Sequence, residues 1–234
     1  MEFGLILALV AGAMIPLGGV LAALEGKTWW TSTARFHHAV TAVAGGALIS
    51  AVALVLVPEG SERLPVWASM VFFALGGGLF AWMNTAISRS GGSRGQLVAM
   101  VADFLPEAVA LGALLASGSS GGIVVAAIIA LQNLPEGYNA FFEAAPEGRA
   151  ARRRLLISYC GIALLGPVAT YLGFTVFAEA DFALGAMMMV AAGGILYLVF
   201  QVVAPKAALN GAWMPPLGAV LGFGLGLMGH LLAG

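Results

Sequence analysis

Long apolar runs, broken at intervals by short polar joints, dominate the sequence. Eight of these runs are long enough to cross a bilayer as helices, which takes about 20 mostly apolar residues. They cover residues 3–24, 36–57, 66–87, 96–116, 122–144, 155–178, 183–203 and 216–233. Because the joints are short, we expect consecutive helices to lie antiparallel and side by side. The pattern therefore predicts an all-α bundle of eight transmembrane helices in one domain, residues 1–234.

The composition agrees with a chain that lies in lipid. Of its 234 residues 61% are hydrophobic and 9% are charged, whereas a soluble domain carries roughly a quarter charged residues. The first run lacks a basic n-region and is long for a signal peptide, so we expect it to be a retained helix. The single cysteine excludes an intrachain disulfide, and a net charge of −1 gives no reason to expect a nucleic-acid partner.

The basic residues predict the orientation of the bundle. With eight spans, the side that holds both termini carries only Arg63. The other side carries the remaining nine of the ten basic residues: Lys27, Arg35, Arg89, Arg94, Arg149, Arg152, Arg153, Arg154 and Lys206. Because basic joints stay in the cytoplasm, we expect both termini to be extracytoplasmic, in a multi-pass protein of the plasma (inner) membrane.

Two matched motifs interrupt the fourth and fifth spans near mid-membrane. The fourth contains VADFLPEAVALG from Val101, and the fifth contains ALQNLPEGYNAF from Ala130. A charged side chain at this depth costs about 2.5–3.5 kcal/mol on insertion scales. The spacing of four residues places Asp103 with Glu107 on one helix face, and Gln132 with Glu136 on another. Since the two spans are joined by a short loop, we expect the motifs to face each other.

These motifs provide oxygen atoms and no positive charge. The prolines cannot donate to the carbonyls four residues earlier, which leaves those oxygens available. No Lys, Arg or His occurs between Arg94 and Arg149. Such a cluster must either take up protons or bind a divalent cation. The alternative is a packing role, in which two kinked helices are joined by protonated acids; two matched motifs at one depth favour the cation.

At these residues the sequence resembles the ZIP family of divalent metal transporters, over essentially the whole chain. Gln132-Asn133-Leu134-Pro135-Glu136-Gly137 fits the family motif of span five, and Asp103-Phe104-Leu105-Pro106-Glu107-Ala108 is an altered form of the motif of span four. Spans two and seven are also similar to those of the family. The resemblance implies eight spans with both termini outside, and alternating access in which spans one, four, five and six move against two, three, seven and eight.

By this resemblance Asp103, Glu107, Gln132 and Glu136 occupy the principal metal site. A second site of the family would map to Phe104, Asn133 and Gln201 with the two glutamates. Phenylalanine cannot be a ligand and Gln201 stands where glutamate is common, so we expect that site to be absent or weak. Asp103 in place of histidine makes the principal site all-oxygen, and we expect a shift away from a strict zinc preference.

The resulting prediction is a carrier that moves zinc or another divalent ion such as Mn, Fe or Cd, as substrate, into the cytoplasm. We find no nucleophile–base constellation or nucleotide loop, and we expect neither an enzyme nor an organic cofactor. Two alternatives remain open. One is a proton-linked carrier of a substrate other than a transition metal, and the other is a membrane protein that binds metal without transporting it.

A few residues outside the motifs have two interpretations each. His37 and His38, at the cytoplasmic start of span two, are either ligands for a released metal or solvated interfacial side chains. Glu59, Glu62, Glu143 and Glu147 either line the mouths of a path or are ordinary interfacial charges. Gly218, Gly222 and Gly226 form a small-residue stripe that predicts close packing, within the fold or in a homodimer. The arginines of 149–154 are expected to contact anionic lipid.

Overall fold

The computed structural model describes residues 1–24, 34–88, 92–116, 118, 121–144, 147–177 and 180–233. Within the helices, the side chains of 34–36, 87–88, 92–96, 98–99, 102–103 and 233 lie outside the described part. The described residues form eight long helical rods, as expected from the eight apolar runs. They comprise α1 (Glu2–Leu24), α2–η2–α3 (Ala34–Ala51, Val52–Leu56, Val57–Glu62), α4 (Val66–Ser88), α5 (Gly92–Ala116), α6 (Gly121–Ala144), α7 (Gly148–Phe177), α8–η3–α9 (Asp181–Leu198, Val199–Val203, Ala204–Ala207) and α10 (Met214–Ala233).

Six of these rods are long and apolar enough to cross a membrane: Glu2–Leu24, His37–Glu62, Val66–Ala86, Gly148–Phe177, Asp181–Ala207 and Met214–Leu232. Large apolar side chains are exposed along them, including Trp82 of α4 and Leu221 of α10. A surface of this kind is stable against lipid and not against water. The chain is a multi-pass membrane protein. The other two rods, α5 and α6, are the ones that carry the polar motifs.

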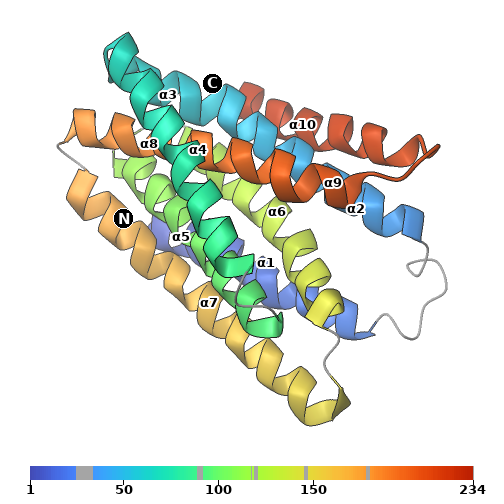
Figure 1. The fold of residues 1–234 in the computed structure, drawn as a ribbon. Coiled ribbons are helices and arrows are strands. Elements are labelled where there is room, and N and C mark those ends of the chain that lie inside the picture. Colours follow the sequence, from blue (N-terminus) through green and yellow to red (C-terminus); the bar gives the residue numbers. More distant parts are fainter. Residues whose placement is uncertain are drawn as a thin grey trace.

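The eight rods pack as two groups of four. In the first group α1 packs against α6 and α7, and α5 packs against α7 and α6; in the second, α10 packs against α2, and α8 packs against α3 and α4. Figure 1 shows α2, α8 and α10 along the upper side of the bundle and α1 and α7 along the lower side. The groups touch chiefly where α6 meets α2 and α10, and where α5 meets α4 and α8. The motif-bearing helices therefore lie at the boundary between the groups.

Both ends of the chain lie at the same end of the bundle, on the left in Figure 1. This is the arrangement that an even number of antiparallel rods produces. Lys27 and Arg89 lie outside the described residues, as do the side chains of Arg35 and Arg94.

Glycine lets α1 and α6 approach closely beside the second motif. A β-carbon on Gly18 would collide with the backbone of Leu134 and Tyr138, and one on Gly137 would collide with the backbone of Ile15. Each helix thus offers a notch to the other, as small residues do at membrane helix interfaces. The residue after Glu136 is therefore fixed against α1, which sets the rotation of α6.

The small-residue stripe of α10 packs within the fold. Gly218 lies against the backbone of Ala39, Gly222 against that of Val43, and Gly226 against the side chain of Ser50. All three partners belong to α2, which explains why α2 and α10 form one of the closest helix pairs in the bundle.

Two rods contain a π-helical segment directly before a proline-containing turn. Val52–Leu56 precedes the turn with Pro58, and Val199–Val203 precedes the turn with Pro205. A proline inside an α-helix removes one hydrogen bond and clashes with the carbonyl four residues earlier, and a wider π turn relieves that clash. Both rods continue past their proline as a consequence, so α3 and α9 extend spans two and seven beyond the predicted ends at 57 and 203.

The start of span six also differs from expectation. Residues 148–154 were expected to belong to a joint. Instead α7 begins at Gly148, so the four arginines of this stretch are helical. Arginine is a strong helix former, and Gly148, the first residue of α7, adopts a φ of 81° that favours glycine.

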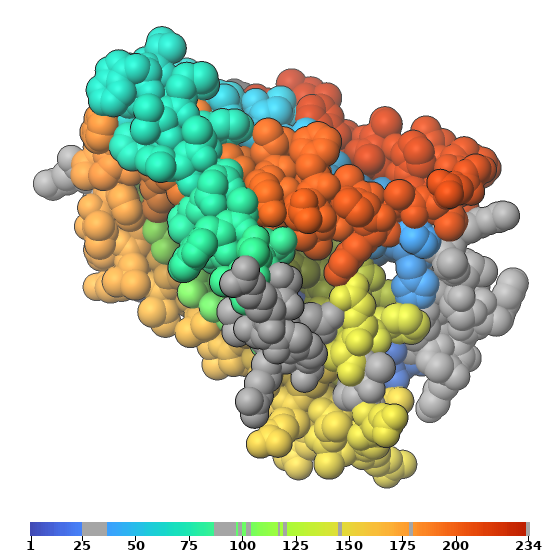
Figure 2. Space-filling view, in the orientation of Figure 1, coloured from blue at the N-terminus to red at the C-terminus, as the bar shows by residue number. Residues whose placement is uncertain are grey.

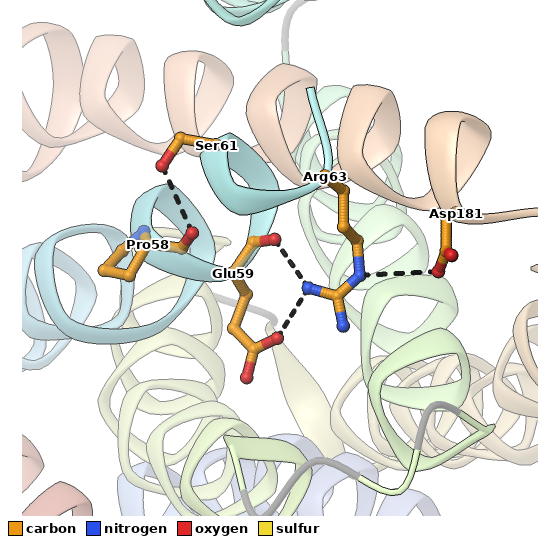
Figure 3. Close-up of polar contacts among 5 residues, drawn as sticks. All are labelled: Pro58, Glu59, Ser61, Arg63 and Asp181. Carbon is orange, nitrogen blue, oxygen red and sulfur yellow. Dashed lines mark hydrogen bonds and ion pairs between the residues drawn. The ribbon is translucent and has the colours of Figure 1, made fainter. Parts of the chain in front are cut away.

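An arginine ties the end of α3 to the start of α8 (Figure 3). Arg63 Nη1 donates to the Glu59 carbonyl at 2.6 Å and to Glu59 Oε2 at 2.7 Å, and its Nε lies 3.9 Å from Asp181 Oδ1. Both helices belong to the same group of four. Glu59 is thus part of a brace at the end of the bundle where the chain termini lie.

Candidate functional site

The two motifs meet through Glu107 of α5 and Gln132 of α6. Gln132 Nε2 donates to Glu107 Oε1 at 2.6 Å and to Glu107 Oε2 at 2.5 Å. Glu107 is 5% exposed and Gln132 is 2% exposed. A hydrogen bond from an amide to an ionised carboxylate is stronger than one between neutral groups, especially where water is excluded. The expectation that the motifs face each other is met by this pair.

The same amide leaves an unsatisfied atom. Gln132 Oε1 is buried and has no hydrogen-bond partner among the described residues. A buried acceptor of this kind normally costs about 1–3 kcal/mol unless a donor or a cation reaches it. The site therefore contains an amide oxygen that lacks a positive partner, directly beside a carboxylate.

Glu136 lies one turn after Gln132 on the same face of α6. It is half-buried, so its carboxylate is nearer to the surface of the bundle than Glu107 is. Asp103 belongs to α5, one turn before Glu107, and its side chain lies outside the described residues. The described part of the site thus consists of two carboxylates and one amide, all on the two motif helices.

Two residues of the second metal position, Phe104 and Asn133, are buried against α1, and the third, Gln201, is exposed. Phe104 is 2% exposed, and its ring lies where β-carbons on Gly12 and Gly166 would be, between α1 and α7. Asn133 is buried and donates Nδ2 to the Ala11 carbonyl of α1 at 2.9 Å. Gln201 is exposed in η3. Phe104 and Asn133 therefore serve the packing of α1 within its group of four.

Among the described residues, no three His, Cys, Asp or Glu side chains are grouped closely enough to hold a metal ion. The amide of Gln132 is not a side chain of these types, and the side chain of Asp103 lies outside the described part. A cation site between α5 and α6 would thus need the amide oxygen of Gln132 or the carboxylate of Asp103 in addition to the two glutamates. Oxygen ligands of this kind suit harder ions better than they suit zinc.

A pocket of about 400 Å³ lies at the far end of α6, and sequence reasoning missed most of its contacts. His37 and His38 from α2, Asn139 and Glu143 from α6, and Lys206 from α9 line it. Lys206 Nζ forms an ion pair with Glu143 Oε1 at 2.7 Å. The signal was present in the sequence, since Gln132, Glu136, Asn139 and Glu143 recur at helical spacing on α6.

No protein-family model matches this chain, and no curated protein matches it. The similarity to the ZIP family therefore depends on the motifs quoted above.

Proposed function

We propose that this protein is a membrane carrier for divalent cations and that one cation binds between α5 and α6. Its ligands are Glu107, Gln132 and Glu136, together with Asp103. The observation that carries the proposal is the buried Gln132 amide beside Glu107, because its oxygen has no partner among the described residues. The two motif helices supply no Lys, Arg or His between Arg94 and Arg149, and this composition favours a bound cation as the source of positive charge.

The Gln132 amide donates to both oxygens of the Glu107 carboxylate. When a cation arrives, the amide rotates about its last side-chain bond and presents Oε1 to the ion. The rotation exchanges one set of favourable contacts for another, so neither state leaves a bare carboxylate in the bundle. The cation-bound and the cation-free forms of the site then differ little in free energy, and a carrier needs this in order to release its cation.

The helix packing supports alternating access. α5 and α6 belong to the group α1, α5, α6 and α7, and they face the group α2–α3, α4, α8–α9 and α10. A site at the boundary between two groups is exposed first to one side and then to the other when the groups rock. This division also agrees with the two units that the resemblance to the ZIP family implies.

The proposed direction is into the cytoplasm. It follows from the nine basic residues on one side of the predicted bundle, combined with the direction usual in the ZIP family. The all-oxygen ligand set leads us to propose transport of Mn²⁺ or Fe²⁺ alongside zinc, since carboxylate and amide oxygens do not select strictly for zinc.

Uptake into proteoliposomes tests this function. The purified protein should move divalent cations from a panel of Zn²⁺, Mn²⁺, Fe²⁺ and Cd²⁺, and Glu107→Gln and Glu136→Gln should each lose that flux. Glu62→Gln is the matched control, because it removes an exposed carboxylate from the other end of the bundle. Proton flux without cation flux would favour the proton-linked carrier, and cation binding without flux would favour a non-transporting binding protein.

A further inference from the structure

The polar face of α6 does not end at the motif. Asn139 and Glu143 follow Glu136 at intervals of three and four residues, so all three lie on one face with Gln132. Exposure increases along this face: Gln132 is buried, Glu136 and Asn139 are intermediate, and Glu143 is exposed. A row of oxygen-bearing side chains thus runs from the buried carboxylate to the end of the helix.

This row leads to the pocket of about 400 Å³ between the ends of α6, α2 and α9. Figure 2 shows the three segments on one face of the molecule, with the end of α6 in yellow, α9 in orange and the start of α2 in blue. By the charge bias of the joints, this is the cytoplasmic end. The pocket is therefore where a cation leaving the motif along α6 would emerge.

Three polar contacts among the described residues join the two groups of helices beside this pocket. Asn139 Nδ2 donates to Thr41 Oγ1 at 2.9 Å, and Tyr138 Oη lies 3.4 Å from His37 Nε2. The His37 ring also stacks on Tyr138, with centroids 5.2 Å apart. Lys206 Nζ lies 2.7 Å from Glu143 Oε1. Separation of α6 from α2 and α9 at this end must break all of these contacts.

We propose that the pocket is the cytoplasmic vestibule of the cation path and that Lys206 is its gate. The Lys206 ammonium is paired with Glu143, the last carboxylate of the row, until a divalent cation displaces the ammonium. This inference depends on the proposed transport function. It adds to that function a transit position for divalent cations at Glu143 and a tethered cation that competes for it.

The exposure of the Lys206 and Glu143 side chains to solvent is suitable for a gate. The side chains of Lys206 and Glu143 are 48% and 40% exposed. An ion pair in contact with water is weak and is exchanged easily, whereas a buried pair would hold the groups together throughout the cycle. A doubly charged ion also attracts the same carboxylate more strongly than the single charge of an ammonium group does.

Three variants separate the gate from simple packing. Lys206→Met keeps a side chain of similar length and removes the charge, Lys206→Arg keeps the charge, and Glu143→Gln removes the other partner. In a Cys160→Ala background, Asn139→Cys reports on opening, by its rate of modification with a water-soluble thiol reagent added to the cytoplasmic face of membrane vesicles. Thermal melting of each variant checks that it is folded.

We expect Lys206→Met and Glu143→Gln to raise the modification rate about twofold to fivefold, the factor that an exposed ion pair contributes. Lys206→Arg should behave as the parent does. Uptake of Mn²⁺ should rise with Lys206→Met, because Glu143 remains and its competitor is gone, and should fall with Glu143→Gln. Modification rates that are equal in the parent and Lys206→Met would overturn the gate.

The binding of Mn²⁺ distinguishes this failure from failure of the proposed function. Suppose that all variants bind one Mn²⁺ at the motif, while the modification rate and the uptake of Mn²⁺ do not change when Lys206 is replaced. The proposed carrier is then supported and the proposed gate is contradicted. If the parent binds no divalent cation, the proposed function itself fails, and the gate fails with it. A variant that does not fold leaves the other charge-removing variant to decide the outcome.

Discussion

Gln132 of α6 donates its side-chain amide to both carboxylate oxygens of Glu107 on α5, and both side chains are buried. This relationship gives the acid a neutral partner and leaves the amide oxygen without a partner among the described residues. A helix pair built only for packing would gain more from two apolar side chains of the same size. The proposed carrier follows from this pair, and so do most of the expectations below.

Replacement of Gln132 by glutamate should make stability depend on divalent cations. Two carboxylates would then face each other, and we expect Gln132→Glu to lower stability by roughly 1–3 kcal/mol without a cation. Saturating Mn²⁺ should reduce or reverse that loss, because it satisfies both charges. The check is thermal melting in detergent with and without Mn²⁺. Thr170→Val is the control, since it removes a buried hydrogen bond to the Ala108 carbonyl and changes none of the proposed ligands. An equal loss with and without Mn²⁺ would count against the site.

The contact of α1 with α6 should tolerate no side chain at Gly137. A β-carbon there would collide with the Ile15 backbone, so we expect Gly137→Ala to lower stability by roughly 1–3 kcal/mol. Gly161→Ala on α7 is the matched control, because no atom lies near its added β-carbon. It should be neutral or stabilising by up to about 1 kcal/mol. Melting temperatures of the two variants make the comparison, and similar values would mean that this helix contact is not as close as described.

Removal of the brace between α3 and α8 should have a small effect that depends on salt. Arg63→Met loses the contacts to Glu59, and we expect a loss of about 1 kcal/mol at low ionic strength. High salt should reduce the difference, since these side chains are partly exposed. The control is Arg153→Met, which changes an exposed arginine of α7. A loss that is independent of salt would indicate that the side chain of Arg63 acts through packing.

The ring of Phe104 should matter for packing and not for the number of cations bound. Phe104→Leu leaves part of the notch between Gly12 and Gly166 empty, and we expect a loss of roughly 1–2 kcal/mol. The stoichiometry of Mn²⁺ binding should stay at that of the parent. Denaturation and equilibrium dialysis measure the two quantities. A changed stoichiometry would mean that position 104 faces the cation.

The sequence was sufficient to predict the eight helices but not all of their ends. Apolar length locates a span, yet it carries no information about how far a helix continues into water. Arg149 to Arg154 are helical because arginine is compatible with a helix, although they are too polar for lipid. The extension past Pro58 depends on a π turn, and its only signal in the sequence was the proline itself.

The sequence was sufficient to predict that the two motifs face each other, but not which of their side chains are in contact. The spacing of Gln132 and Glu136 gives their shared face, but the rotation of α6 is set by the contact of Gly137 with Ile15, which lies far away in the sequence. For this reason the pairing of Gln132 with Glu107, and the turn of Asn133 towards Ala11, appear only in three dimensions. The ion pair of Lys206 with Glu143 likewise joins residues from two different spans.

The central claim is that a divalent cation binds where Glu107 and Gln132 meet. Titration calorimetry of the purified protein with Mn²⁺ tests it most directly, with Glu107→Gln and the control Glu62→Gln measured in parallel. We expect one Mn²⁺ per chain for the parent and for Glu62→Gln, and no binding for Glu107→Gln. Binding that is unchanged in Glu107→Gln, or no binding of Mn²⁺, Zn²⁺, Fe²⁺ or Cd²⁺ to the parent, would contradict it.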